Sequence, residues 1–360
     1  MPLPVETRNA WAALALRALP HAAWVALLKS FGSPEAILAA TPARLAAVVP
    51  REVAAAIGAP PDADALARTL AWLEAPGNAM VAWDDPDYPG ALLELGFAPP
   101  VLYLVGRREL LNRPALAIVG SRSATAQGLD NARAFARALA DAGLTIVSGL
   151  ALGIDAAAHE GALAGAGSTL AVVGTGLDRV YPASNRELAH AIAERGALVS
   201  EFPPGTPPRA TNFPRRNRLI SGLARGVLVV EAALQSGSLI TARYAGEQGR
   251  EVFAIPGSIH SPLAKGCHKL IREGAKLVET AAHVLEELGM AAPAAPLQSA
   301  AAPPMSESPL LAALAHDPAD LDCLVQRTGQ PAAAVLAELT GLELGGIVEA
   351  LPGGIWRRRH

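Results

Sequence analysis

The sequence predicts an α/β protein with a doubly wound parallel sheet, preceded by a small helical module and followed by a second small domain. Two observations support this fold class. Between residues 115 and 280, six short apolar runs alternate with helical patterns, and each run is followed by a turn of Gly, Ser, Pro or Glu. A hydrophobic content of 51% with 18% charge also supplies enough apolar side chains for packed cores in a chain of 360 residues.

Residues 1–75 are expected to form the helical module, because short helical patterns alternate there with Pro and Gly. Ser33 before Pro34 fits an N-cap followed by proline at the first helical position. Since the module holds few basic residues, we expect a structural or partner-docking role rather than binding to a DNA backbone. Apolar residues recur at helical spacing in three segments: Trp11–Leu19, His21–Phe31 and Ser33–Ala40.

The sheet is expected within residues 115–290, after a bridging segment at 76–114 that holds one strand-like run, Val101–Val105. Strands that are covered on both faces are apolar or β-branched throughout, and the candidate runs have this character. Six runs are the strand candidates: Leu116–Val119, Leu144–Val147, Thr169–Val173, Ala197–Ser200, Val227–Val230 and Val252–Ile255.

The end of the chain is expected to form a separate winged-helix-like domain at 309–360, after an Ala/Pro-rich linker at 291–308. A helix-turn-helix followed by a hairpin is typical of that arrangement. The candidate elements are the helices Asp320–Thr328 and Pro331–Leu344 around a Gly329-Gln330 turn, and the hairpin strands Gly345–Glu349 and Gly353–Trp356.

The second helix of this domain argues against DNA recognition. It carries Glu338 and Glu343 and no Lys or Arg, and phosphates repel an acidic helix. Three terminal arginines, Arg357, Arg358 and Arg359, could touch DNA but could equally form a solvated tail. We therefore interpret this domain as a protein-interaction or accessory domain.

One segment of the chain is strongly cationic, although the whole chain carries a formal charge of -3. Pro203 to Arg225 contains five arginines and no Asp or Glu, and Phe213 lies within it. Arginines that neutralise phosphates, next to a ring on which bases stack, are the minimal equipment for binding single-stranded nucleic acid. A helix start with solvated arginines would explain the same residues, so the segment alone leaves both interpretations open.

Glycine and serine residues follow most of the predicted strands. Ligands of open parallel sheets bind outside the carboxyl ends of the strands, and free N–H groups at helix starts attract anions. Arg122 stands at the tip of the first such loop, where a guanidinium could bind phosphate. We therefore expect an anion-binding rim formed by these loops: Gly120–Arg122, Ser148–Asp155, Gly174–Asp178, Ser200-Glu201, Ser236–Ser238 and Pro256–Ser258.

The motifs of common nucleotide enzymes are missing. No Gly-x-Gly-x-x-Gly follows the first strand and no P-loop motif occurs, which disfavours dinucleotide binding and P-loop ATP hydrolysis. Asp155 and His159, four residues apart on a predicted helix, could form an acid–base couple or a helix cap with a neighbouring histidine. Glu201 and Glu231 could act as bases or could hold loop N–H groups and arginines.

The composition favours a cytoplasmic protein without a metal or other cofactor. Cys267 and Cys323 lie far apart with no metal-ligand spacing, as expected for buried thiols in a reducing compartment. No basic and apolar leader pattern opens the chain, and no apolar run reaches about 18 residues, so no membrane contact is expected.

From Leu116 to Thr280 the sequence resembles the DNA-processing protein A (DprA/Smf) family. The order and spacing of several motifs carry the resemblance, and the Asp85–Pro89 segment fits the flank of the family domain. The matching motifs are Ala117–Arg122, Ser148–Asp155 with His159, Gly174–Asp178 with Tyr181-Pro182 and Asn185, Ser200-Glu201, Phe213–Leu223, Glu231-Ala232, Ser236–Thr241, Ile255–Ser258, Gly266–His268, Leu270-Ile271 and Gly274-Ala275.

The resemblance implies a protein without enzymatic activity that binds and protects single-stranded DNA and loads the RecA recombinase during natural transformation and recombination. It implies a homodimer of extended Rossmann-like domains, with a SAM-like helical module and a winged-helix-like domain at the two ends. It assigns DNA contacts to Arg122 and Phe213. The implied dimer interface is Cys267, Lys269, Leu270 and Ile271.

The rim loops, the cationic segment and the resemblance together give a candidate DNA-binding set. Many relatives have Lys three residues before the Phe, where this chain has Ala210 beside Arg209. Arg209 could substitute, although its side chain would leave the backbone in another direction. The candidate set is Ser121, Arg122, Gly149, Gly153, Arg209, Phe213, Arg215, Asn217, Arg218, Ser236, Gly237 and Ser238.

A nucleotide hydrolase of the phosphoribohydrolase type, on a related Rossmann-like fold, is the alternative function. Glu201 or Glu231 would then act as the base while the glycine loops hold the phosphate. The Pro-Gly-Gly-x-Gly-Thr-x-x-Glu motif of such enzymes has no match here, and Pro256-Gly257-Ser258 is its nearest counterpart. A transcription regulator that reads DNA through the C-terminal domain is disfavoured by the acidic helix.

Overall fold

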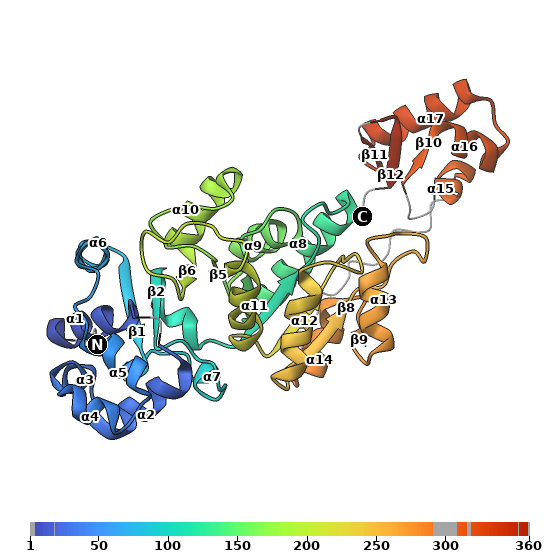
Figure 1. Cartoon of the computed structure of the whole chain (residues 1–360). Helices are drawn as coiled ribbons and strands as arrows, with labels where there is room; N and C mark the ends of the chain where they lie inside the picture. Colours follow the sequence, from blue (N-terminus) through green and yellow to red (C-terminus); the bar gives the residue numbers. More distant parts are fainter. Residues whose placement is uncertain (1–3, 18, 291–307, 315–317, 352, 359–360) are drawn as a thin grey trace. The chain divides into compact units, whose positions relative to one another are not determined.

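The computed structural model describes residues 4–17, 19–290, 308–314, 318–351 and 353–358. The chain divides into two compact units, Met1–Pro293 and Ala294–His360 (Figure 1). The predicted linker at 291–308 lies outside the described residues except for its last position, and so does Arg359. Within the described ranges, no helix is both long and apolar enough to span a membrane.

A nine-stranded sheet forms the centre of the first unit, in the order β1-β2-β6-β5-β4-β3-β7-β8-β9. The seven neighbouring strands from β6 to β9 run parallel, which confirms the predicted doubly wound parallel sheet. The six predicted strands are all present, with ends within one residue of the prediction. The parallel strands are β3 (Ala115–Val119), β4 (Thr145–Ser148), β5 (Thr169–Val172), β6 (Ala197–Ser200), β7 (Gly226–Val229), β8 (Glu251–Ala254) and β9 (Lys276–Leu277).

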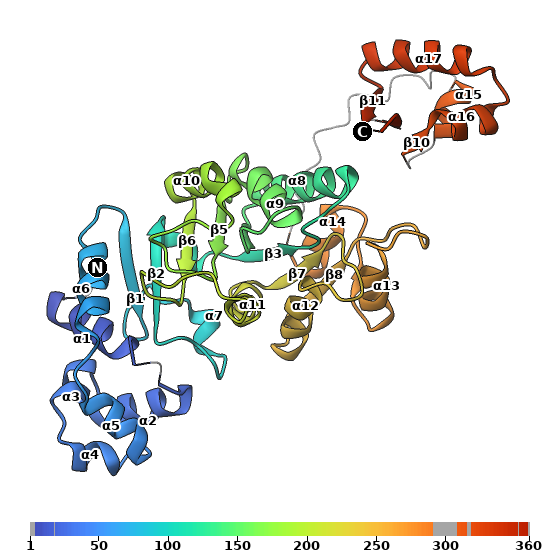
Figure 2. The ribbon, with the colours of Figure 1, turned by 45° about the horizontal axis from the view of Figure 1, so that its top comes forward.

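Helices cover both faces of this sheet (Figure 2). Successive strand residues point to opposite faces, so in β3 Leu116 and Ile118 pack under one helix layer and Ala117 and Val119 under the other. The first layer consists of α8 (Ala126–Asp141), α9 (Ile154–Leu163), α10 (Arg186–Arg195) and α14 (Ala281–Glu287). The second consists of α7 (Gly90–Leu93), α11 (Asn212–Gly222), α12 (Ser238–Glu247) and α13 (Lys265–Arg272).

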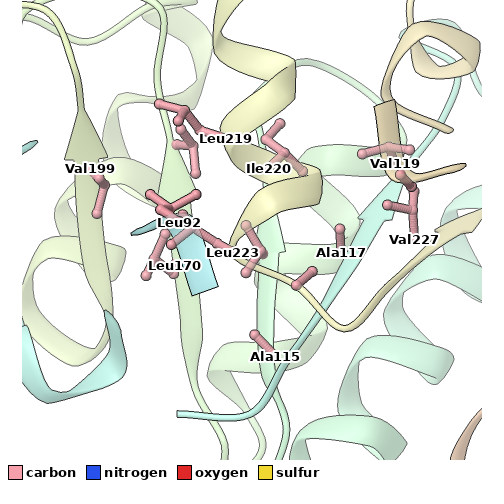
Figure 3. Packing of buried hydrophobic residues seen from close by; sticks show 14 of the residues in the cluster. Leu92, Ala115, Ala117, Val119, Leu170, Val199, Leu219, Ile220, Leu223 and Val227 are labelled. Atoms are coloured by element: carbon pink, nitrogen blue, oxygen red, sulfur yellow. The ribbon is translucent and has the colours of Figure 1, made fainter. Parts of the chain in front are cut away.

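Helix α11 is held firmly on the sheet. Its Leu219 and Ile220 are at most 1% exposed and pack over Ala117, Val119 and Val227 of the central strands (Figure 3). Full burial of such a side chain stabilises the folded state by roughly 1.5–3 kcal/mol. This anchoring fixes the position of the polar and aromatic residues in the first turns of α11.

The predicted bridging segment extends the sheet. It forms β1 (Asn78–Ala82), which was not predicted, and β2 (Val101–Gly106), and β2 pairs antiparallel with both β1 and β6. Residues alternate along these strands, so that Val81 and Leu102 enter the core of the sheet while Met80 and Tyr103 enter the core of the helical module. The two strands therefore belong to both cores.

The helical module packs on this antiparallel pair (Figure 1). Ser33 is the N-cap of α3, since its hydroxyl oxygen accepts the Ala36 N–H at 3.2 Å. The first helix begins earlier than predicted, at Val5 instead of Trp11. The module consists of α1 (Val5–Ala15), α2 (His21–Phe31), α3 (Pro34–Ala39), α4 (Pro42–Ala46), α5 (Arg51–Gly58) and α6 (Ala63–Leu73).

The second unit is a small domain with its own core, formed by residues such as Leu324, Val335 and Leu339. The two predicted helices and the predicted hairpin are present, and β10 adds a third strand in the order β10-β12-β11. Its elements are α15 (Pro309–Leu314), β10 (Ala319–Asp320), α16 (Leu321–Thr328), α17 (Ala332–Leu344), β11 (Val348–Leu351) and β12 (Ile355–Arg358). Arg357 is 7% exposed and bonded to Glu349, so it packs within the hairpin and is not part of a solvated tail.

Candidate nucleic-acid interface

A cavity of about 820 Å³ opens at the carboxyl edge of the parallel sheet, and we call it the rim cavity. The cavity lies where β3 and β7 are neighbours in the sheet. Strands β3 to β6 follow one another in one direction from there and β7 to β9 in the other, so the direction of winding reverses between β3 and β7. Such switch points are the usual ligand sites of open α/β sheets. Seven of the twelve candidate residues line the rim cavity: Ser121, Arg122, Phe213, Asn217, Ser236, Gly237 and Ser238.

Phe213 presents an aromatic face to the rim cavity from the first turn of α11. The ring lies against the backbone of Gly174, where an added Cβ would be only 3.1 Å from Phe213 Cδ1. The ring of Tyr181 lies beside it, with the centroids 5.5 Å apart, and the Arg122 guanidinium carbon is 5.8 Å from the Phe213 centroid. Two rings, tilted by 36° to each other, and a cation thus meet at one place in the rim cavity, and we call this group the stacking surface.

Tyr181 is a member of the site that the candidate set missed. Its side chain is 46% exposed and lines the rim cavity. The sequence held a signal for it, because an aromatic residue directly after the loop of a parallel strand stands at the ligand edge of the sheet.

Arg216 forms the floor of the rim cavity and also lay outside the candidate set. It is 4% exposed and donates from Nη1 to the carbonyl oxygens of Gly149, at 2.6 Å, and Val172. Burial lowers the pKa of Arg216 to about 10, against the opposing attraction of Asp155, so the guanidinium stays charged at neutral pH. The buried Arg216 side chain therefore connects two elements beneath the binding surface: the loop after β4 and the strand β5.

The first two amides of the loop after β4 are engaged within the protein and are not free for a phosphate, as the prediction required. The Gly149 N–H donates to Asp155 Oδ2 at 3.1 Å, and the next N–H, of Leu150, donates to His159 Nε2 at 3.3 Å. Gly153 has φ +75° and lies so close to the first loop that a Cβ would be 2.3 Å from the Ser121 carbonyl oxygen. Gly149 and Gly153 therefore shape the edge of the site and do not line it.

Asp155 and His159 hold this loop and do not form an acid–base couple. His159 is fully buried, and burial lowers its pKa to about 3, so the ring is neutral at neutral pH. Because Nε2 accepts from Leu150, the proton lies on Nδ1, which donates to Thr169 Oγ1 at 2.7 Å. Burial raises the pKa of Asp155, and the Arg216 charge opposes that shift.

The remaining arginines of the candidate set lie elsewhere. Arg215 Nε is 3.0 Å from Glu201 Oε1, and Arg218 bonds to the same carboxylate and to the Phe97 carbonyl oxygen, at 2.8 Å. Both side chains face a second cavity, described below, instead of the rim cavity. Arg209 is exposed, and its neighbours Pro208 and Ala210 line the rim cavity where Arg209 does not.

The two carboxylates proposed as bases of a nucleotide hydrolase are both engaged in structural contacts. Glu201 is the shared partner of Arg215 and Arg218. Glu231 accepts the Thr125 N–H at 2.9 Å and bonds to the Thr125 hydroxyl, so it holds the start of α8. Neither carboxylate lines the rim cavity.

The implied dimer region lies on α13 and is in part inaccessible. Cys267 is fully buried, with Sγ 3.6 Å from the Val229 and Val230 carbonyl oxygens, and burial raises its pKa to about 11. Leu270 is 9% exposed, whereas Lys269 is exposed and Ile271 half-buried. Cys267 therefore belongs to the core and not to an interface. Cys323 is half-buried, not fully buried as expected.

The fold and the rim cavity together define a Rossmann-like α/β protein with a cationic, aromatic binding site at the switch point of its sheet. The family model described as DNA recombination-mediator protein A matches residues 79–289, and the one described as DprA winged helix domain matches residues 280–354. The chain belongs to the DprA/Smf family, as its motifs predicted.

Relatives and solved structures agree with this assignment. The chain is 45% identical to Protein Smf of Escherichia coli over 301 residues, which are 81% of this chain and 80% of the relative. It is similar to the X-ray structure of DNA processing protein A from Streptococcus pneumoniae, with a TM-score of 0.69, 38% identity and coverage of 80% and 99%. DNA processing protein A from Helicobacter pylori, described for a unique single-stranded DNA binding mode, matches with a TM-score of 0.54, 31% identity and coverage of 59% and 95%.

Proposed function

We propose that this chain is a DNA-processing protein that binds single-stranded DNA in the rim cavity without catalysing a reaction. The observation that carries the proposal is the stacking surface of Phe213, Tyr181 and Arg122 at the switch point of the sheet. The single-stranded DNA binding mode for which the Helicobacter pylori relative is described supports the same function.

Base stacking and phosphate attraction would act together in this site. An unpaired base has a free face for the rings of Phe213 and Tyr181, whereas the bases of a duplex are already stacked and paired. Arg122 is exposed and has no salt bridge within the residues that the structure describes, so its charge is available to a phosphate. Every base has such a face, so binding would be nearly independent of sequence.

The start of α12 contributes polar groups to the same site. Ser236, Gly237 and Ser238 line the rim cavity, and the hydroxyl oxygens of the two serines are 2.7 Å apart. Asn217 donates to the Gly237 carbonyl oxygen at 3.4 Å and so ties α11 to this loop. We assign Ser236–Ser238 to the phosphates that flank the stacked base.

The proposal also covers the partners of the chain and its place in the cell. The chain would protect incoming single strands and load the RecA recombinase on them during natural transformation and recombination, as a cytoplasmic homodimer. The description of the family as a recombination mediator supports the recombinase partner. A homodimer would hold one strand in two rim cavities and gain avidity. Lys269, Leu270 and Ile271 remain the proposed contacts of the dimer.

Competition binding tests the proposal. A labelled oligo-dT bound to the full chain should be displaced by unlabelled single strands at far lower concentration than by duplex of equal length. Phe213→Leu, which keeps an apolar side chain but removes the ring, should narrow that difference. Equal competition by duplex, or turnover of nucleoside monophosphates by the protein, would contradict the proposal and favour the nucleotide hydrolase.

A further inference from the structure

A second cavity, of about 340 Å³, lies between the helical module, β2 and the start of α11, and we call it the module cavity. The helical module contributes Trp24, and Phe97 and Tyr103 contribute further rings. Arg215 and Arg218 line the same cavity from α11. Aromatic rings beside guanidinium groups are the side chains on which unpaired bases stack.

Arg215 forms a fixed, planar surface at this cavity. Its Nη2 donates to Glu201 Oε2 at 3.1 Å, and its Nε lies 3.0 Å from Oε1 in the same ion pair, so the carboxylate holds the guanidinium in place. One face of that plane lies over the ring of Phe202, with 5.3 Å to the centroid. The side chain is nevertheless 59% exposed, so part of the guanidinium remains open to a ligand.

The module cavity carries a net positive charge at its wall. Glu201 is 1% exposed and is shared by Arg215 and Arg218, so one carboxylate faces two guanidinium groups. His21 also lines the cavity, but burial and the Arg218 charge lower its pKa and keep it neutral. The excess of one cation attracts a phosphate that accompanies a base.

Tyr103 supplies an unused polar group. Its side chain is fully buried and lines the module cavity, and its hydroxyl has no hydrogen-bond partner among the described residues. Burial raises the pKa of Tyr103, so the hydroxyl stays protonated and can both donate and accept. Burial of a hydroxyl without a partner is unfavourable, which favours a ligand with polar edge atoms. Nucleobases have such edges.

The two cavities are neighbours along the chain. Phe213 and Arg215 occupy the first turn of α11, about 200° apart around the helix, and so face different cavities. The segment before α11 leads from Pro203 in the module cavity to Pro208 in the rim cavity, with Arg209 exposed directly after it. A strand that leaves the rim cavity across the start of α11 would pass Arg209 and arrive at Arg215.

We propose that the module cavity is a second base-binding subsite of the single-stranded DNA path. A base stacks on the open part of the Arg215 guanidinium and directs its polar edge toward the Tyr103 hydroxyl. Arg209 contacts the backbone between the two cavities. The proposal rests on the proposed function, because the strand must first be held in the rim cavity.

A length series of oligo-dT separates the two subsites in the full chain. Oligonucleotides from about 4 to about 16 nucleotides cover the site sizes of single-stranded DNA-binding folds. The wild-type affinity should rise in a step once the strand is long enough to reach the second cavity. Arg215→Lys keeps the charge and the partner Glu201 but removes the plane, and should lose at least about fivefold in affinity for long strands and none for short ones.

Two further variants complete the test. Arg137→Lys is the matched control, since Arg137 is 64% exposed and paired with Asp141 on the other face of the sheet. Tyr103→Phe removes only the hydroxyl, so it should lower the affinity for long strands without lowering the unfolding temperature. A length step that persists unchanged in Arg215→Lys and Tyr103→Phe would overturn the second subsite while leaving the rim cavity intact. Absence of single-strand binding by the wild type would instead overturn the proposed function.

Discussion

The two sides of α11 place arginines of one segment in opposite electrostatic settings. Toward the rim cavity, Phe213 stands beside the exposed Arg122, and Arg216 is buried in the floor. Toward the module cavity, Arg215 and Arg218 share the carboxylate of Glu201. Arginines that are neighbours in the sequence therefore lie at different cavities. Burial and the nearest carboxylate determine whether each arginine has a structural role or can contact a ligand.

Removal of the buried arginine should have the largest effect on stability. Arg216→Ala leaves Asp155 buried without its cation and the carbonyl oxygens of Gly149 and Val172 without a donor, which we expect to cost about 3–5 kcal/mol. Arg215 is 59% exposed and its partner Glu201 keeps the pair with Arg218, so Arg215→Ala should cost less than about 1 kcal/mol. Urea unfolding of both variants measures the loss in the free energy of unfolding. Equal losses would show that the burial of Arg216 does not make it more important for stability than Arg215.

The neutral histidine beneath the loop gives a pH-dependent effect of similar size. The pKa of His159 is about 3 in the folded protein and about 6.5 in the unfolded chain. Its contribution to stability is complete above pH 6.5 and declines as the pH falls from there toward 3, by about 1.4 kcal/mol per pH unit. His159→Gln should remove this dependence. Unfolding curves measured from about pH 7 down to about pH 4 should therefore diverge between wild type and variant, and parallel curves would contradict a buried neutral ring.

Loss of the central ring should weaken binding by an intermediate amount. Phe213→Ala removes one stacking face, which is worth about 1–3 kcal/mol per base in single-stranded DNA-binding proteins. Anisotropy titration with labelled oligo-dT measures the change, and the unfolding temperature checks that the variant is folded. Wild-type affinity in the folded variant would remove Phe213 from the interface.

The second ring should have the smallest effect. Tyr181→Ala leaves Phe213 in place, so we expect a loss of about 1 kcal/mol or less. Because the ring centroids are 5.5 Å apart, the double variant should deviate from the sum of the single losses. Strict additivity in the same titration would mean that the two rings contact the strand separately.

The fold was largely readable from the sequence, because strands buried on both faces leave an unmistakable apolar pattern. Ala197–Ser200 was predicted with its observed ends. β1 was missed, since its residues alternate between two cores and its sequence Asn78–Ala82 opens with a polar residue. β9 has only two residues, Lys276 and Leu277, and too short a pattern for periodicity to detect.

The sequence predicted only part of the site, because it indicates where backbone segments lie but not which side chains meet in the tertiary fold. Arg122, Phe213 and Ser236 could be placed at the rim because strand ends and helix starts fix the position of backbone segments. The partner of each arginine could not be placed, because Glu201 and Asp155 reach the cationic segment only through the tertiary fold. The spacing of residues in the sequence predicts where a charged side chain lies. It does not predict which opposite charge is paired with it.

The salt dependence of single-strand binding tests the rim cavity most directly. Anisotropy of labelled oligo-dT across a salt series should be compared for wild type, Arg122→Ala and the control Arg137→Ala. We expect Arg122→Ala to lower affinity at every salt concentration and to reduce the slope of log affinity against log salt by about 0.7, the value for one phosphate contact on a single strand. An unchanged slope and affinity in Arg122→Ala would place the strand outside the rim cavity and contradict the proposed interface.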